Sequence, residues 1–122
     1  MPITKQIRHI FEPTPLQCGQ AVLAMLTGKS VDSIVKECSN EKETTLKQMF
    51  TVLNNNGIAV VNNRTEFMDK TDLPDVALLS LETPKCWHWS LYYYGKFYDP
   101  EYGFKSDIPP SKRRYYWKLC NK

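Results

Sequence analysis

The sequence predicts an α+β fold in a single domain, residues 1–122, with helices in the first half and an antiparallel sheet in the second. Apolar side chains recur at helical spacing before Gly57, whereas short apolar and aromatic segments typical of strands follow it. Helices followed by strands are typical of α+β domains. The 122 residues suffice for one domain with a buried core that needs no disulfides.

Composition excludes several other classes of protein. Hydrophobic residues make up 42% and charged residues 24%, which excludes a disordered tail, a collagen-like rod and a coiled coil. The longest apolar run, residues 21–26, is far shorter than the ~20 residues that cross a bilayer, so no membrane partner is expected. The net charge of +3 allows weak attraction to anions but does not require a nucleic acid.

The cysteines indicate a reducing environment. The chain has four of them at wide spacings, Cys18, Cys38, Cys86 and Cys120, and its N-terminus lacks the apolar core of a secretory signal. We therefore expect free thiols in a cytoplasmic protein. No cysteine pair has the spacing of a zinc knuckle, and His9 and His88 are far apart, so a structural metal site is not expected.

Three helices are predicted from their apolar positions and end signals. The first begins near Cys18 and is apolar on most sides, which predicts a buried central helix that ends at Gly28. Ser30 is placed to cap a second, short helix. Thr45 opens a capping-box pattern for the third, which ends near residue 56.

Strands are predicted at residues 58–61, 76–81, 89–94 and 97–99. The second of these is mostly apolar and therefore central, and Gly95-Lys96 predicts a tight hairpin turn between the last two. The tail, residues 109–122, is basic and aromatic without a clear period. Such a mixture occurs in single-strand nucleic-acid grooves, but it is more often a terminal strand with solvated charges, which we favour.

Cys18, His88 and Asp99 are candidate catalytic residues. At a helix start, unpaired N–H groups favour the thiolate, the nucleophilic form of Cys18, and Gly19 would let a substrate backbone approach. His88 begins a strand and could take the thiol proton and return it to the leaving group. Asp99 could accept a hydrogen bond from the imidazole and orient it. The competing interpretation makes Cys18 a small buried hydrophobe.

Strand geometry supports this set only in part. Alternation along the hairpin places His88 and Asp99 on the same face of the sheet. With Gly95-Lys96 as the turn, however, they are offset by four residues, or roughly 13 Å, so contact requires strong twist or a bulge. In that register Glu101 lies diagonal to His88 and is a rival for the orienting role.

Two segments resemble papain-like cysteine peptidases, closest to the bacteriocin-leader (double-glycine), or peptidase C39-like, branch. Gln17-Cys18-Gly19-Gln20-Ala21 and the residues up to 31 resemble its nucleophile helix, and residues 88–100 resemble its His strand and Asp-Pro strand. The resemblance implies a papain-like fold, with N-terminal helices packed on a C-terminal antiparallel sheet. It also implies that Cys18 is the nucleophile, His88 the general base and acid, and Asp99 the orienting group, with no cofactor.

The sequence departs from this family at position 12. The family has a glutamine six residues before the cysteine, where the side-chain amide donates to the oxyanion, but this chain has Glu12. An ionised carboxylate cannot donate, and losing one such donor costs ~10²–10³ in rate. Gln17 and Gln6 are the other side chains that could replace it.

The sequence therefore leads to two functional hypotheses. The first is a cysteine peptidase-like hydrolase, or a related thiol acyl-transfer enzyme such as a deamidase, acting on a peptide or protein. The alternative is a catalytically degraded module that keeps the fold and binds a peptide or protein partner. In both, Trp87 and Trp89 are candidates to line a substrate cleft beside His88. Because no membrane-spanning segment is evident, we do not expect the chain to include the rest of an export transporter.

Overall fold

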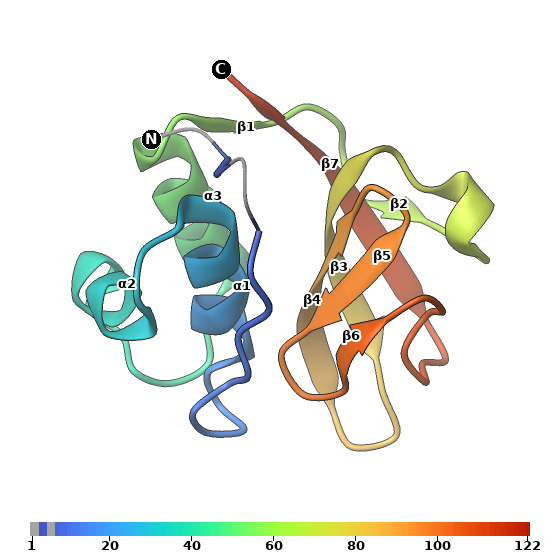
Figure 1. Cartoon of the computed structure of the whole chain (residues 1–122), viewed down its shortest axis with the longest axis horizontal. Coiled ribbons are helices and arrows are strands. Elements are labelled where there is room, and N and C mark those ends of the chain that lie inside the picture. Colours follow the sequence, from blue (N-terminus) through green and yellow to red (C-terminus); the bar gives the residue numbers. More distant parts are fainter. Residues whose placement is uncertain (1–2, 5–6) are drawn as a thin grey trace.

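Three helices pack against one face of a curled antiparallel sheet (Figure 1). This computed structural model describes residues 3–4 and 7–122. Across these residues the α-helices are α1 (Cys18–Thr27), α2 (Val31–Cys38) and α3 (Leu46–Asn55), and a 3₁₀ turn spans Lys70–Asp72. No helix in the described ranges is both long and apolar enough to span a bilayer.

The three helices begin and end as their local sequence predicts. Gly28 ends α1 with φ at 75°, a left-handed conformation that glycine adopts without strain. The Ser30 hydroxyl accepts a hydrogen bond from the Ser33 N–H at the start of α2. At α3, Thr45 and Gln48 form the expected reciprocal capping box.

The strands form one sheet in the order β1-β7-β3-β4-β5-β6, with the short β2 also paired to β7. Their bounds are β1 Ile58–Val60, β2 Thr65–Glu66, β3 Val76–Glu82, β4 Trp87–Tyr93, β5 Lys96–Asp99, β6 Gly103–Lys105 and β7 Arg114–Asn121. The predicted central strand is confirmed as β3. The basic, aromatic tail forms β7, which is not at the edge of the sheet but lies between β1 and β3.

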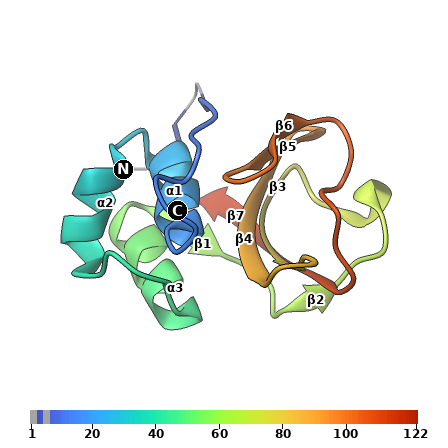
Figure 2. The ribbon, with the colours of Figure 1, turned by 90° about the horizontal axis from the view of Figure 1, so that it is seen from below.

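Two apolar clusters hold the layers together. The larger lies between the helices and the sheet, and α1, every residue of which is buried, runs through it next to the sheet (Figure 2). The smaller lies on the other, concave face of the sheet. It consists of Phe67, Ala77, Leu79, Leu81, Tyr92 and Phe97. Burial of α1 therefore fixes the position of its first residue, Cys18, against the sheet.

The hairpin between β4 and β5 forms, but its turn lies one residue earlier than predicted. Tyr93 pairs with Lys96, so Tyr94 and Gly95 are the turn residues, and both have positive φ, at 43° and 87°. That pair of angles is typical of a type I′ turn, whose twist suits a hairpin. The shift halves the predicted four-residue offset, because continuing this register places Asp99 opposite Ser90, two residues from His88.

Gly19 is enclosed by protein and is not at an open surface. A Cβ atom there would collide with the Thr44 hydroxyl and touch the Met49 sulfur. We expect Gly19→Ala to destabilise the fold by about 1–3 kcal/mol, the usual cost of overpacking a buried site. Urea unfolding monitored by tryptophan fluorescence measures this. Gly95→Ala is the comparison variant, because a Cβ atom there meets no other atom within 4 Å but the positive φ of Gly95 disfavours alanine. The two variants together separate the cost of crowding from the cost of backbone strain.

Candidate active site

Cys18 lies at the first turn of α1 with its sulfur turned toward the sheet. The preceding residue, Gln17, makes no capping hydrogen bond with its side chain, and the first turn contains no acidic residue. No side chain of that first turn therefore neutralises the partial positive charge of the helix start, although the Glu12 carboxylate lies within 4.8 Å of the sulfur. The backbone N–H of Trp89 also donates to the Cys18 Sγ at 3.4 Å. Backbone N–H groups of the helix start and of β4 therefore converge on the sulfur.

His88 is oriented by Asp99. Its Nε2 lies 2.8 Å from the Asp99 Oδ1, and both side chains are buried. Since a carboxylate only accepts hydrogen bonds, Nε2 carries a proton and Nδ1 is the nitrogen left for other groups. Glu101, the rival, instead pairs with Lys85 at 3.0 Å.

Asp99 is itself held in place by three further donors. The Ser90 hydroxyl donates to Oδ2 at 2.7 Å, and the backbone N–H groups of Glu101 and Tyr102 donate to Oδ1 at 2.8 and 2.9 Å. Ser90 is not among the residues predicted from the sequence, although alternation places it on the same face of β4 as His88. This network fixes the carboxylate before any ligand binds, so it also fixes the imidazole.

The charges of this pair are mutually stabilised. Burial disfavours the imidazolium, but the hydrogen bond and charge of Asp99, together with the neighbouring Cys18 sulfur, outweigh it and raise the pKa of His88 to about 10. Burial likewise disfavours the ionised Asp99, yet His88 and the other donors lower the pKa of Asp99 below its ordinary value. The ion pair with Asp99 therefore favours the protonated form of His88.

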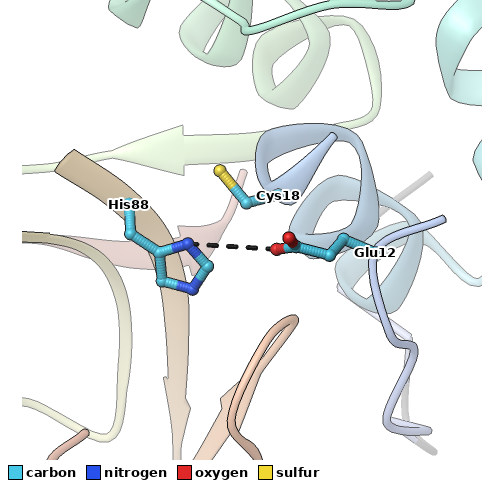
Figure 3. Close-up of side chains that lie close together, drawn as sticks. All are labelled: Glu12, Cys18 and His88. Atoms are coloured by element: carbon cyan, nitrogen blue, oxygen red, sulfur yellow. Dashed lines mark ion pairs between the residues drawn. The ribbon is translucent and has the colours of Figure 1, made fainter. Parts of the chain in front are cut away.

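Three side chains from different parts of the chain meet at this point, as Figure 3 shows. Glu12 comes from the N-terminal segment, Cys18 from α1 and His88 from β4. One donor atom from each lies within 4.8 Å of the others. A thiol beside an imidazole whose far nitrogen bonds a carboxylate is the arrangement that nucleophilic catalysis by cysteine uses.

Two contacts between the N-terminal segment and the end of β5 hold Glu12 at this point. Its N–H donates to the carbonyl oxygen of Pro100 at 2.9 Å, and the His9 Nε2 lies 2.6 Å from the carbonyl oxygen of Asp99. The Glu12 Oε1 lies 3.9 Å from the His88 Nδ1 and is buried without a hydrogen-bond partner. Burial raises the pKa of Glu12, although the charge of His88 partly opposes this.

The other predicted site residues differ in their burial and in the contacts that they make. Gln17 is half-buried and directly precedes Cys18, whereas Gln6 lies outside the described residues. Gly19 is buried against Thr44, as described above. Trp87 is 48% exposed and stacks on Tyr115, and Trp89 donates from its indole to the carbonyl oxygen of Thr44 at 3.2 Å.

A hollow of about 400 Å³ opens beside the Cys18 sulfur. Its walls come from the turn before α1, the loop before α3, strand β3, and the start of β4 with the residue before it. They are formed by Pro15, Leu16, Cys18, Glu43, Thr44, Ser80, Cys86, Trp87, His88 and Trp89. The hollow therefore places Trp87 and Trp89 next to His88. The four cysteines are free thiols, and Cys86 is the exposed one among them.

Two solved structures resemble the fold over nearly its full length. One is the peptidase domain of Streptococcus ComA, a bi-functional ABC transporter involved in a quorum-sensing pathway, with a TM-score of 0.65 and 12% identity over 96% of this chain and 100% of that one. The other is a double-glycine-motif protease from an AMS/PCAT transporter in complex with its leader peptide, with a TM-score of 0.65 and 14% identity over 99% and 98%. No family profile and no curated protein matches the sequence.

These neighbours establish the fold. The chain has the α+β, papain-like architecture of the peptidase domains of such transporters, as the sequence resemblance implies. At 12–14% identity the likeness carries no information on individual residues.

Proposed function

We propose that this chain is a cysteine peptidase that cleaves a peptide bond through Cys18, His88 and Asp99. The observation that carries the proposal is the position of the Cys18 sulfur. It lies at an uncapped helix start, beside an imidazole whose other nitrogen bonds a buried carboxylate. A peptide substrate is further supported by one structural neighbour, which was solved with its leader peptide.

The chemistry follows from the proton positions. The Cys18 thiolate attacks the carbonyl carbon, forming a C–S bond and an oxyanion. As the tetrahedral intermediate collapses, the C–N bond breaks and the His88 imidazolium gives its proton to the departing amine. The neutral imidazole then takes a proton from water, which attacks the thioester and releases the acid and the Cys18 thiolate. Asp99 keeps the ring oriented in both halves.

Stabilisation of the oxyanion is the weak part of this site. Glu12 stands beside the reacting groups, and an ionised carboxylate there repels negative charge that develops on the carbonyl oxygen. This observation favours the second candidate function, in which the chain retains the peptide-binding hollow but cleaves slowly or not at all. The two candidates differ in turnover, not in binding.

We expect Glu12→Gln to raise kcat/KM by about 10²–10³-fold, because it replaces a repelling carboxylate with an amide that donates to the oxyanion. The assay follows cleavage of a defined peptide mixture, including peptides with Gly-Gly pairs, by mass spectrometry in the presence of a chelator. Glu43→Gln is the matched control, because Glu43 lines the same hollow but does not belong to the cluster of Glu12, Cys18 and His88. Equal rates in the wild type and the Glu12→Gln variant would refute the assigned effect of Glu12.

A further inference from the structure

The three side chains that converge at the start of α1 also form a set of metal ligands. Glu12, Cys18 and His88 supply a carboxylate oxygen, a sulfur and an imidazole nitrogen within 4.8 Å of one another. Around a tetrahedral zinc ion with one sulfur, one oxygen and one nitrogen ligand, these atoms lie roughly 3.4–3.6 Å apart, given Zn–N and Zn–O bonds near 2.1 Å and a Zn–S bond near 2.3 Å. The 3.9 Å between the Glu12 Oε1 and the His88 Nδ1 is already close to that range.

The unpaired oxygen of Glu12 is an independent reason to look for a ligand here. The Oε1 atom is buried, faces the cluster and has no hydrogen-bond partner. Buried carboxylate oxygens normally accept a hydrogen bond or coordinate an ion. A cation between the Glu12 oxygen and the Cys18 sulfur would satisfy the oxygen and neutralise two like charges.

The surroundings of His88 match those of a metal-bound histidine. Its Nε2 donates to the Asp99 Oδ1 at 2.8 Å, which leaves Nδ1 directed toward Glu12. Histidine ligands commonly donate their second ring N–H to a carboxylate, which orients the ring and makes it a better ligand. Asp99 is anchored by Ser90 and two backbone N–H groups, so this outer support is in place without a metal.

We propose that this chain binds one Zn²⁺ through Glu12, Cys18 and His88, with the fourth position open toward the hollow lined by Trp87 and Trp89. A thiolate, an imidazole and a carboxylate together favour zinc over the hard cations magnesium and calcium. The bound ion coordinates the sulfur that would otherwise attack a substrate, so the zinc-bound form is unable to start acyl transfer. This site does not depend on the chain being a peptidase, because it requires only the three donors.

The site escapes sequence analysis because its ligands are widely separated. Position 12 lies before the first helix and position 88 in the fourth strand, so no short spacing motif exists. Glu12, which cannot donate to an oxyanion when ionised, supplies the third ligand. A glutamine at position 12 would offer only a neutral amide oxygen, which is a poorer ligand for zinc.

Cobalt substitution tests the site without an activity readout. Titrating the full chain with Co²⁺ should give one equivalent of tetrahedral d–d absorption and a thiolate-to-cobalt charge-transfer band, both removed by added Zn²⁺. Glu12→Gln should weaken binding by more than about a hundredfold, since even loss of an outer-shell partner costs 10–100-fold. Cys18→Ser should abolish the charge-transfer band while circular dichroism shows that the fold remains.

Two controls share the hollow but not the cluster. Cys86→Ser and Glu43→Gln each remove a potential ligand from the same walls and should leave the cobalt spectrum and affinity unchanged. Absence of the spectrum in the wild-type chain overturns the proposal. So does a spectrum that survives Glu12→Gln at full affinity, or one that is lost in Cys86→Ser. None of these results bears on peptide cleavage, which is assayed with a chelator present.

Discussion

Replacing Cys18 with alanine is expected to lower peptide cleavage by more than about 10⁴-fold, because the acyl-enzyme of the proposed mechanism forms on the Cys18 sulfur. His88→Ala should cost a similar factor, and the double variant little more, since the two residues act as one unit. These losses are best measured in the Glu12→Gln variant. Its higher expected rate of cleavage leaves the widest range over which a decrease in rate can be detected.

Cys86→Ala is the matched control for the loss of a thiol. Cys86 lines the same hollow and is exposed, so its removal should leave the rate within about twofold. If Cys18→Ala retained the activity of its parent, the nucleophile would have to be another group. A hydrolase based on Cys18 would then be excluded.

Replacing Asp99 with alanine is expected to destabilise the fold by about 3–5 kcal/mol, the usual cost of removing one partner from a buried ion pair. The change leaves His88, the Ser90 hydroxyl and two backbone N–H groups without their shared acceptor. Urea unfolding near pH 6 measures the free energy of unfolding. Glu101→Ala removes a carboxylate two residues away that pairs with an exposed lysine, and should cost at most about 1 kcal/mol.

The same ion pair predicts how stability depends on pH. The pKa of His88 is raised from 6.5 to about 10, so the folded chain holds this proton more tightly than the unfolded chain. Its contribution is complete below pH 6.5 and is lost as the pH rises through about 10. The pKa of Asp99 is lowered from 3.8, so its contribution is present above pH 3.8 and lost as the pH falls further.

The free energy of unfolding should therefore be greatest between pH 3.8 and pH 6.5, where both contributions are present. It should decline as the pH rises from 6.5 toward about 10. Asp99→Asn keeps the shape of the side chain but removes the charge, so it should flatten the decline between pH 6.5 and 10. An unchanged alkaline slope in that variant would show that His88 does not hold its proton through Asp99. Stability measured by urea unfolding across this range decides the matter.

The local sequence signals were sufficient for the helices and the inner strands. Gly28, Ser30 and Thr45 act as the end signals that their residue types predict, because caps depend on a few neighbouring atoms. The strand β7 was harder to recognise, because its burial alternates only at Trp117 and Leu119 among exposed and half-buried residues. Its place between β1 and β3 depends on tertiary pairing, which no local pattern encodes.

The sequence could nominate candidate site residues but not their geometry. Cys18 could be nominated only when its position at the helix start was combined with His88 and the family resemblance. His88 and Asp99 were nominated from their places in a hairpin and from the same resemblance. The one-residue error in the turn arose because Tyr94, a residue that rarely adopts positive φ, occupies the first turn position. The partnership of Ser90 with Asp99, and of Glu12 with the Cys18–His88 pair, depends on contacts between distant segments.

The most direct test of the account is the rate at which Cys18 reacts with iodoacetamide at neutral pH, with a chelator present, measured by mass spectrometry against Cys86 in the same molecule. Cys18 is 8% exposed and Cys86 is exposed, so accessibility alone makes Cys86 the faster of the two. A thiolate maintained by His88 reverses that order, and His88→Ala restores it. If Cys86 reacts faster in the unmodified protein, or if His88→Ala leaves the ratio unchanged, then the imidazole does not activate this sulfur and the catalytic proposal is wrong.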